Sequence, residues 1–166
     1  MRDHRTSLLI LGTLTLLYVV HMVYGLSDQP GPMATHFGSG GRPNGWMSNS
    51  AFLLFGAALW ATMVACFWTL RPLLRRVKPS LVNIPHKAWW LDPVRREETI
   101  ATAGAWMESM GVVTLIGLFG LNECLFLANR RPEVELGTEF IVGIVVYLVI
   151  TLVWSVAFIR MWRNPG

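Results

Sequence analysis

Residues 140–161 read FIVGIVVYLVITLVWSVAFIRM, and Arg160 is the only charged residue in the stretch. A bilayer core of about 30 Å requires about 20 helical residues, so this stretch is long enough to cross a membrane. Three further apolar runs of similar length lie at about 7–26, 51–70 and 104–128. The sequence therefore predicts an all-α protein, a bundle of four transmembrane helices that forms a single integral membrane domain over residues 1–166.

The composition excludes an ordinary soluble domain. Apolar residues make up 53% of the chain and charged residues only 14%, whereas a soluble domain has about 25% charged residues. The mean hydropathy of +0.45 agrees with this. The lipid bilayer is thus the first partner that the sequence predicts.

The basic residues predict the orientation. Of the 14 Lys and Arg residues, eleven lie in the amino terminus, the connection 71–103 and the carboxy terminus, and three lie in the two other connections. Short loops rich in Lys and Arg remain in the cytoplasm. We therefore expect both termini and the loop 71–103 to be cytoplasmic and the loop 27–50 to lie outside. Because topology accounts for the net charge of +4, we expect no nucleic-acid partner.

The two long loops differ in character. The outer loop 27–50 contains five glycines and three prolines, which favours an ordered series of turns, among them Pro43-Asn44-Gly45. The cytoplasmic loop 71–103 is broken by prolines in its first half. Asp92 and Pro93 then suit the cap and first position of a helix, which we expect to continue from about 93 to 129.

Polar residues inside the spans are candidates for function, because ionisable groups at membrane depth are costly. Glu108, Asn122 and Glu123 lie on one side of the third span, which we expect to face the bundle centre. His21 and Glu123 both lie in the outer halves of their spans, so they could converge with His36 of the outer loop. Two interpretations remain open: a site for a proton or a divalent metal, zinc or copper, and a structural His–Glu hydrogen bond.

No motif in the sequence indicates a reaction. The patterns GxGxxG, GxxxxGK[ST], GxSxG and CxxC do not occur, and each of them would position phosphates, a nucleophile or a redox pair. We therefore expect a protein without enzymatic activity and with no cofactor beyond the metal considered above.

Two loop motifs stand out in the sequence. The outer motif lies in the outer loop and the start of the second span; besides Pro30 it comprises Thr35, His36, Phe37, Gly38, Gly41, Pro43, Gly45 and Trp46. The inner motif lies in the segment 83–99, NIPHKAWWLDPVRREET, and comprises Asn83, Pro85, Lys87, Trp90, Leu91, Pro93, Arg95, Arg96, Glu97 and Glu98. The outer motif is similar to the signature of the membrane family called domain of unknown function 1648, which is related to the amino-terminal part of SdpI-type immunity and signalling proteins. The inner motif resembles an inner-loop motif of many members of that family.

The resemblance implies a multi-pass protein of the bacterial inner (plasma) membrane that acts in sensing, in immunity or as an accessory component, with a protein partner in the membrane or the cytoplasm. A first alternative is a metal- or proton-handling membrane enzyme or transporter subunit that uses His21, His36 and Glu123. A second alternative is an accessory subunit of a larger membrane complex.

Overall fold

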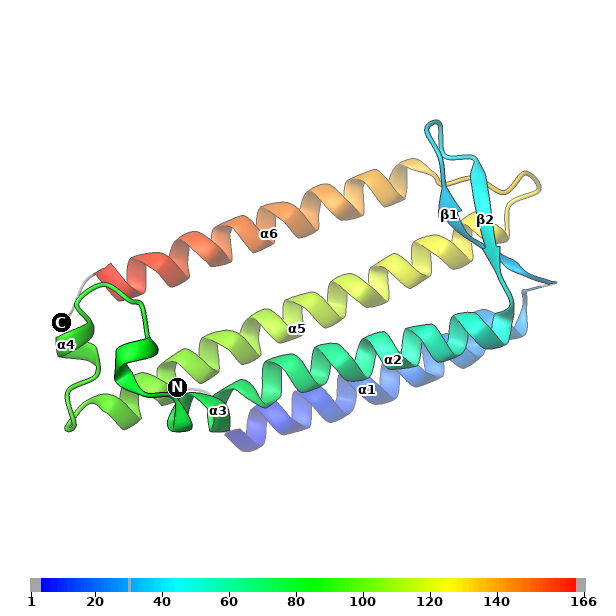
Figure 1. Cartoon of the computed structure of the whole chain (residues 1–166). Helices are drawn as coiled ribbons and strands as arrows, with labels where there is room; N and C mark the ends of the chain where they lie inside the picture. Colours follow the sequence, from blue (N-terminus) through cyan, green and yellow to red (C-terminus); the bar gives the residue numbers. More distant parts are fainter. Residues whose placement is uncertain (1–3, 30, 164–166) are drawn as a thin grey trace.

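The computed structural model describes residues 4–29 and 31–163, which are mostly helical (Figure 1). Arg2 of the charge count and Pro30 of the outer motif lie outside these residues. In the described part, four helices are long and apolar enough to cross a membrane: α1 His4–Ser27, α2 Asn49–Trp68, α5 Arg96–Asn129 and α6 Thr138–Arg163. This is the pattern of a multi-pass membrane protein, and it confirms the prediction of four spans.

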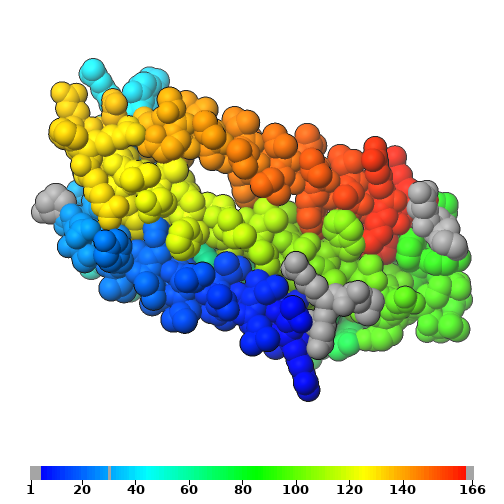
Figure 2. All heavy atoms as spheres, turned by 180° about the vertical axis from the view of Figure 1, so that it is seen from behind, coloured from blue at the N-terminus to red at the C-terminus, as the bar shows by residue number. Residues whose placement is uncertain are grey.

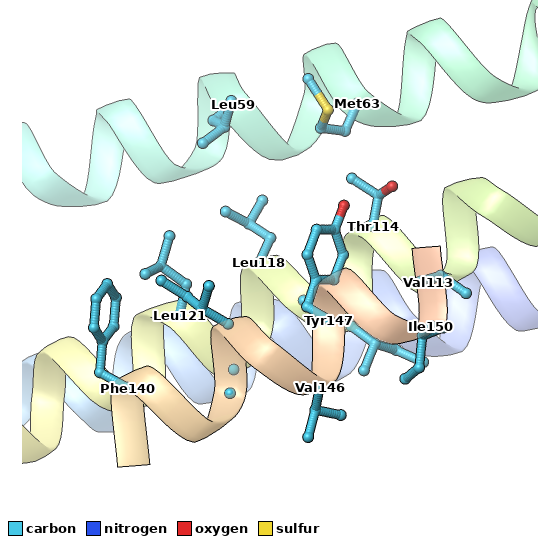
Figure 3. A pocket seen from close by; sticks show the side chains of 15 residues that line it. Leu59, Met63, Val113, Thr114, Leu118, Leu121, Phe140, Val146, Tyr147 and Ile150 are labelled. Atoms are coloured by element: carbon cyan, nitrogen blue, oxygen red, sulfur yellow. The ribbon is translucent and has the colours of Figure 1, made fainter. Parts of the chain in front are cut away.

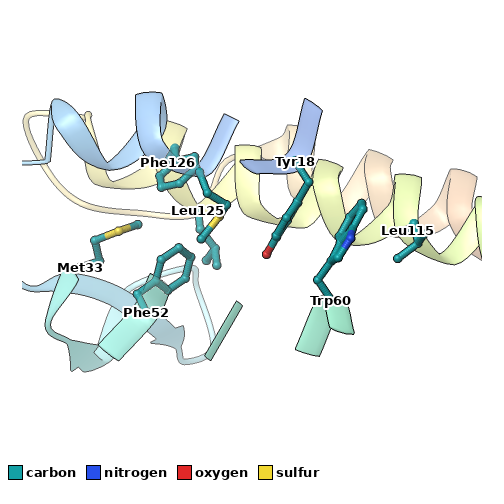
Figure 4. Close-up of a cluster of buried hydrophobic side chains, with 8 residues drawn as sticks. Tyr18, Met33, Phe52, Trp60, Leu115, Leu125 and Phe126 are labelled. Atoms are coloured by element: carbon teal, nitrogen blue, oxygen red, sulfur yellow. The ribbon is translucent and has the colours of Figure 1, made fainter. Parts of the chain in front are cut away.

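Helix α5 is the centre of the bundle, because it contacts α1, α2, α6 and the short helix α3, Leu70–Arg76. Helix α6 runs along the opposite side of α5 from α1 (Figures 1 and 2). The buried hydrophobic cluster of the described residues has no member from α6 (Figure 4); it consists of Tyr18, Met22, Met33, Phe52, Trp60, Leu115, Leu125 and Phe126. The core therefore lies between α1, α2 and α5, and most apolar side chains of α6 are left to face lipid.

Close contacts of small and aromatic residues hold α1 against its neighbours. The rings of Tyr18 and Trp60 stack with their centroids 4.0 Å apart, and Trp60 Nε1 donates a hydrogen bond to Thr15 Oγ1 at 3.1 Å. A Cβ atom on Gly25 would overlap the ring of Phe126. Glycine at this position therefore allows α1 to approach α5, as small residues do in membrane helix pairs.

The outer loop corrects the all-α prediction, because it forms an antiparallel β-hairpin. Strand β1 is Met33–Phe37 and strand β2 is Pro43–Met47. The connection turns at Gly40 and Gly41, whose φ angles are +82° and +75°, a region that glycine enters without a steric penalty. The predicted turn at Pro43-Asn44-Gly45 is wrong: Pro43 is the first residue of β2, a position that does not need its missing N–H.

The loop 71–103 folds into short pieces beside the start of α5. They are α3, a 3₁₀ turn at Pro79–Leu81 and the short helix α4, Lys87–Trp90. Helix α5 begins at Arg96 rather than at residue 93. The Asp92 carboxylate accepts the Val94 N–H at 3.0 Å, so Asp92 stabilises the turn that leads into the helix instead of capping the helix itself.

The second span also ends earlier than expected. Helix α2 stops at Trp68, two residues before the end of the predicted run. The hydroxyl of Thr69 donates to the carbonyl of Ala65 at 2.5 Å, and such back-bonding from a threonine bends helices. The chain continues as α3, which carries Arg71 toward α5.

Candidate functional site

One face of α5 carries polar groups into the bundle. Glu108 and Asn122 are only 3% and 5% exposed. Gly104 and Gly111 on the same face are also buried, and a Cβ atom on Gly104 would lie 2.5 Å from Arg71 Nε. The absence of side chains at these glycines therefore makes room for large neighbours beside the buried acid.

The outer end of this face holds an aromatic and polar cluster from α1 and α5. Asn122 Nδ2 donates to the Tyr18 hydroxyl at 3.1 Å. The imidazole of His21 stacks on Phe119 with ring centroids 4.0 Å apart, and its Nε2 lies 3.7 Å from Glu123 Oε2. This distance is longer than a hydrogen bond, so the pair is an electrostatic contact when the imidazole is protonated.

His36 lies apart from that pair. It is exposed on β1, where its Nδ1 is 3.1 Å from Thr35 Oγ1. Across residues 4–29 and 31–163, no three His, Cys, Asp or Glu side chains are grouped so that they could hold a metal ion. The structure thus brings together His21 and Glu123 of the three expected ligands but not His36.

The hairpin is attached to the end of α5 by a side chain that the sequence analysis did not single out. Asn129 Oδ1 accepts the N–H of Ala34 at 2.8 Å, and Asn129 Nδ2 donates to the carbonyl of Ala34 at 2.9 Å. The amide thereby pairs with β1 as a neighbouring strand would. A second link joins the Leu136 N–H to the Gly41 carbonyl at 3.0 Å, so both ends of the hairpin are tied to the α5–α6 region.

The outer-motif residues are distributed over this hairpin. Trp46 of β2 is 59% exposed, and the His36 side chain packs beside Gly45 of the opposite strand. The motif occupies three parts: β1 carries Thr35, His36 and Phe37, the turn carries Gly38 and Gly41, and β2 carries Pro43, Gly45 and Trp46. The hairpin therefore presents an imidazole and an indole to the surroundings from a strand pair that is hydrogen-bonded to the bundle.

The inner end of α5 holds a buried charge cluster. The Ser7 hydroxyl donates to Glu108 Oε2 at 2.6 Å, and Arg71 Nε lies 3.7 Å from Glu108 Oε1. Arg71 also donates from Nη2 to the Ala101 carbonyl at 3.1 Å. Sequence spacing could not identify Ser7 and Arg71 as partners of Glu108, because they come from α1 and α3.

The inner motif connects the loop 71–103 to α5 and α6. Arg96 Nη2 donates to the carbonyls of Arg75 and Val77, each at 3.1 Å. Trp90 Nε1 donates to the Trp162 carbonyl at 3.2 Å. Lys87 and Arg95 donate hydrogen bonds to carbonyls of the same loop, and Glu97 forms an ion pair with Arg75. Leu91 lines a hollow between α3, α5 and α6. The remaining members of the motif are exposed: Asn83, Pro85, Pro93 and Glu98. Most of these bonds join residues within 71–103 and so fold the loop on itself, and the Trp90 bond joins it to α6.

An apolar groove of about 650 Å³ lies between α2, α5 and α6. Figure 3 shows Leu59 and Met63 of α2 pointing toward Leu118 of α5, and Tyr147 of α6 pointing toward α2. A Cβ atom on Gly117 would lie only 2.8 Å from the Tyr147 ring. Because its walls are almost entirely apolar and belong to three membrane-length helices, the groove suits lipid tails rather than a polar substrate.

Comparisons with known proteins find no relative. No protein-family model matches the chain, and neither a curated protein nor a solved structure matches it.

Proposed function

We propose that this chain is a non-enzymatic, SdpI-like protein of the bacterial inner membrane that recognises a ligand with its outer hairpin. Both termini and the loop 71–103 lie in the cytoplasm in this proposal, as the distribution of Lys and Arg favours. Recognition at the hairpin is relayed to the cytoplasmic loop, which then engages a protein partner or confers immunity.

The observation that carries the proposal is the attachment of the hairpin to α5 through Asn129. Helix α5 has 34 residues and is therefore about 50 Å long. Its other end begins at Arg96, which holds the carbonyls of Arg75 and Val77. A displacement of the hairpin would thus act on one continuous rod whose far end contacts the inner loop.

The recognition step is tested in a heterologous bacterial host that is challenged with a panel of membrane-active peptide toxins. We expect cells that express the chain to survive at least one peptide that kills cells carrying an empty vector. Survival should be lost in His36→Ala/Trp46→Ala and kept in Trp46→Phe, which preserves an exposed aromatic ring. Equal survival of the double variant at equal membrane levels would contradict recognition by the hairpin.

The orientation is tested by cysteine labelling in intact cells, with Cys66 and Cys124 replaced by alanine. A cysteine at Ser39 should react with an impermeant maleimide, whereas a cysteine at Ser80 should react only after permeabilisation. A reporter fused after Pro165 should behave as cytoplasmic. The reverse labelling pattern would invert the topology.

A second candidate function follows from the contact between His21 Nε2 and Glu123 Oε2 at 3.7 Å. An imidazole and a carboxylate at membrane depth could carry a proton or supply two of the ligands of a zinc or copper ion. Metal analysis of the purified protein tests this function. Stoichiometric metal that is retained in His36→Ala and lost in His21→Leu would support it.

A further inference from the structure

Two adjoining hollows lie at the end of the bundle that carries the inner loop. The deeper one, of about 220 Å³, lies between α3, α5 and α6 and has mostly apolar walls. The other hollow, of about 520 Å³, is more open and is called the surface hollow. Both are lined by Val77, Pro79, Leu91 and Arg96, so the two hollows adjoin, and together we call them the recess.

The mouth of the recess is positively charged. The surface hollow is lined by Arg76, Lys78 and Arg96, and none of its lining residues is acidic. Two carbonyl contacts hold the Arg96 guanidinium in place. In the part of the chain that the structure describes, Arg76 and Lys78 form no ion pair, whereas their neighbour Arg75 pairs with Glu97. The charges of Arg76 and Lys78 are therefore available to an anion.

One buried residue in the wall of the deeper hollow carries a polar side-chain group. Trp162 of α6 lines this hollow and is 5% exposed. Its Nε1 is buried and, within the described residues, has no hydrogen-bond partner. A buried polar group of this kind normally has a partner, so an acceptor such as an ester oxygen would complete the site. The surrounding walls, which include Phe158, Met107 and Ala103, are suited to an acyl chain.

We propose that this recess binds an anionic phospholipid, with the phosphate at Arg76, Lys78 and Arg96 and part of an acyl chain in the apolar hollow. Basic recesses between membrane helices are known to suit phosphate-bearing lipid headgroups. A free phosphate would satisfy the cations but would leave the apolar hollow unfilled. A zwitterionic lipid would fill the hollow but would bring a cation close to three others.

The binding experiment uses the full chain in a neutral detergent and three short soluble probes. Dioctanoyl phosphatidylglycerol should raise the melting temperature saturably, whereas dioctanoyl phosphatidylcholine and glycerol phosphate should have little effect. An equal response to phosphatidylcholine, or an equal response to glycerol phosphate, would overturn the proposal. A short polyglutamate peptide that saturates the site more tightly than the anionic lipid would also overturn it, since an acidic protein segment would then be the better ligand.

Variants assign the binding to this recess. Arg76→Gln/Lys78→Gln should weaken the apparent affinity for phosphatidylglycerol roughly 10- to 30-fold, since each cation near an anionic lipid contributes about 1 kcal/mol. The matched double variant Arg42→Gln/Arg160→Gln removes the same charge from exposed positions outside the recess and should bind as the parent does. Equal affinities of the two double variants would place the lipid elsewhere. Both pairs lie on the surface, so both variants should fold.

A second pair of variants tests the apolar hollow. Ala103→Leu extends a side chain into this hollow and should weaken binding of the dioctanoyl lipid by at least several-fold. Ala61→Leu places the same side chain on the exposed face of α2 and should leave binding unchanged. Unchanged affinity in Ala103→Leu would show that no acyl chain enters the hollow and would refute that part of the proposal.

Discussion

Replacing Asn129 by alanine should weaken the attachment of the hairpin to the bundle. The side chain satisfies both the N–H and the carbonyl of Ala34, and Ala34 is 0% exposed. A buried backbone group that loses its partner costs about 1–3 kcal/mol. Because Asn129 itself is partly exposed and water can reach the bundle end, we expect a loss of about 2–4 kcal/mol for the two groups together. For a chain of this size, that corresponds to a decrease in melting temperature of roughly 4–16 °C.

The assay combines thermal unfolding in detergent with hydrogen exchange measured on peptides from the outer loop. Exchange should accelerate in β1 of Asn129→Ala before the helices unfold. Asn44→Ala is the matched control, since it removes the same amide from an exposed position on β2 and should change neither quantity. Asn129→Asp should resemble the alanine variant, because a carboxylate can accept the Ala34 N–H but cannot donate to its carbonyl. If Asn129→Ala behaved like Asn44→Ala, the proposed coupling between hairpin and α5 would be refuted.

Three further sets of substitutions test the packing, and each variant is measured as a melting temperature in detergent. The double variant His21→Leu/Glu123→Leu should lose less stability than the two single variants lose in sum, with a coupling of about 0.5–3 kcal/mol. Strict additivity would show that the pair does not interact, and a zinc-dependent stabilisation would favour the metal function. Gly25→Ala should cost about 1–3 kcal/mol from overpacking, whereas Gly12→Ala, with open space around it, should be neutral or stabilising; equal effects would mean that α1 does not approach α5 closely there. Asp92→Ala should cost about 0.5–1.5 kcal/mol by removing one hydrogen bond, the bond to the Val94 N–H, and no change would show that this turn does not need the bond.

Local patterns were sufficient for the spans, because the thickness of the bilayer dictates how many consecutive apolar residues a helix needs. The run 140–161 lies wholly within α6, and the run 104–128 lies wholly within α5. The ends of the helices were harder to predict from the sequence. The turn at Asp92 and the bend at Thr69 depend on individual side-chain hydrogen bonds, which a hydropathy run does not register.

The hairpin shows why the outer loop was harder to predict. Its glycines and Pro43 are compatible with turns as well as with a strand pair, and five-residue strands carry little periodicity. The Gly40-Gly41 turn between two short segments was the available signal. An isolated two-stranded hairpin is marginally stable in water, so its formation depends on Asn129 and Leu136, which lie far along the chain.

The sequence by itself determined the class of this protein, a multi-pass membrane protein: it has four apolar runs, a basic loop between the second and third runs, and polar residues on one face of the third span. Tertiary structure alone decided which of those polar residues meet. Ser7 and Glu108 are 101 positions apart, and Ala34 and Asn129 are 95 positions apart. The physical reason is that periodicity reports which face of a helix is buried, whereas a buried hydrogen bond requires two particular groups at one depth and within about 3 Å. Only the packing of α1, β1 and α3 on α5 brings such groups together.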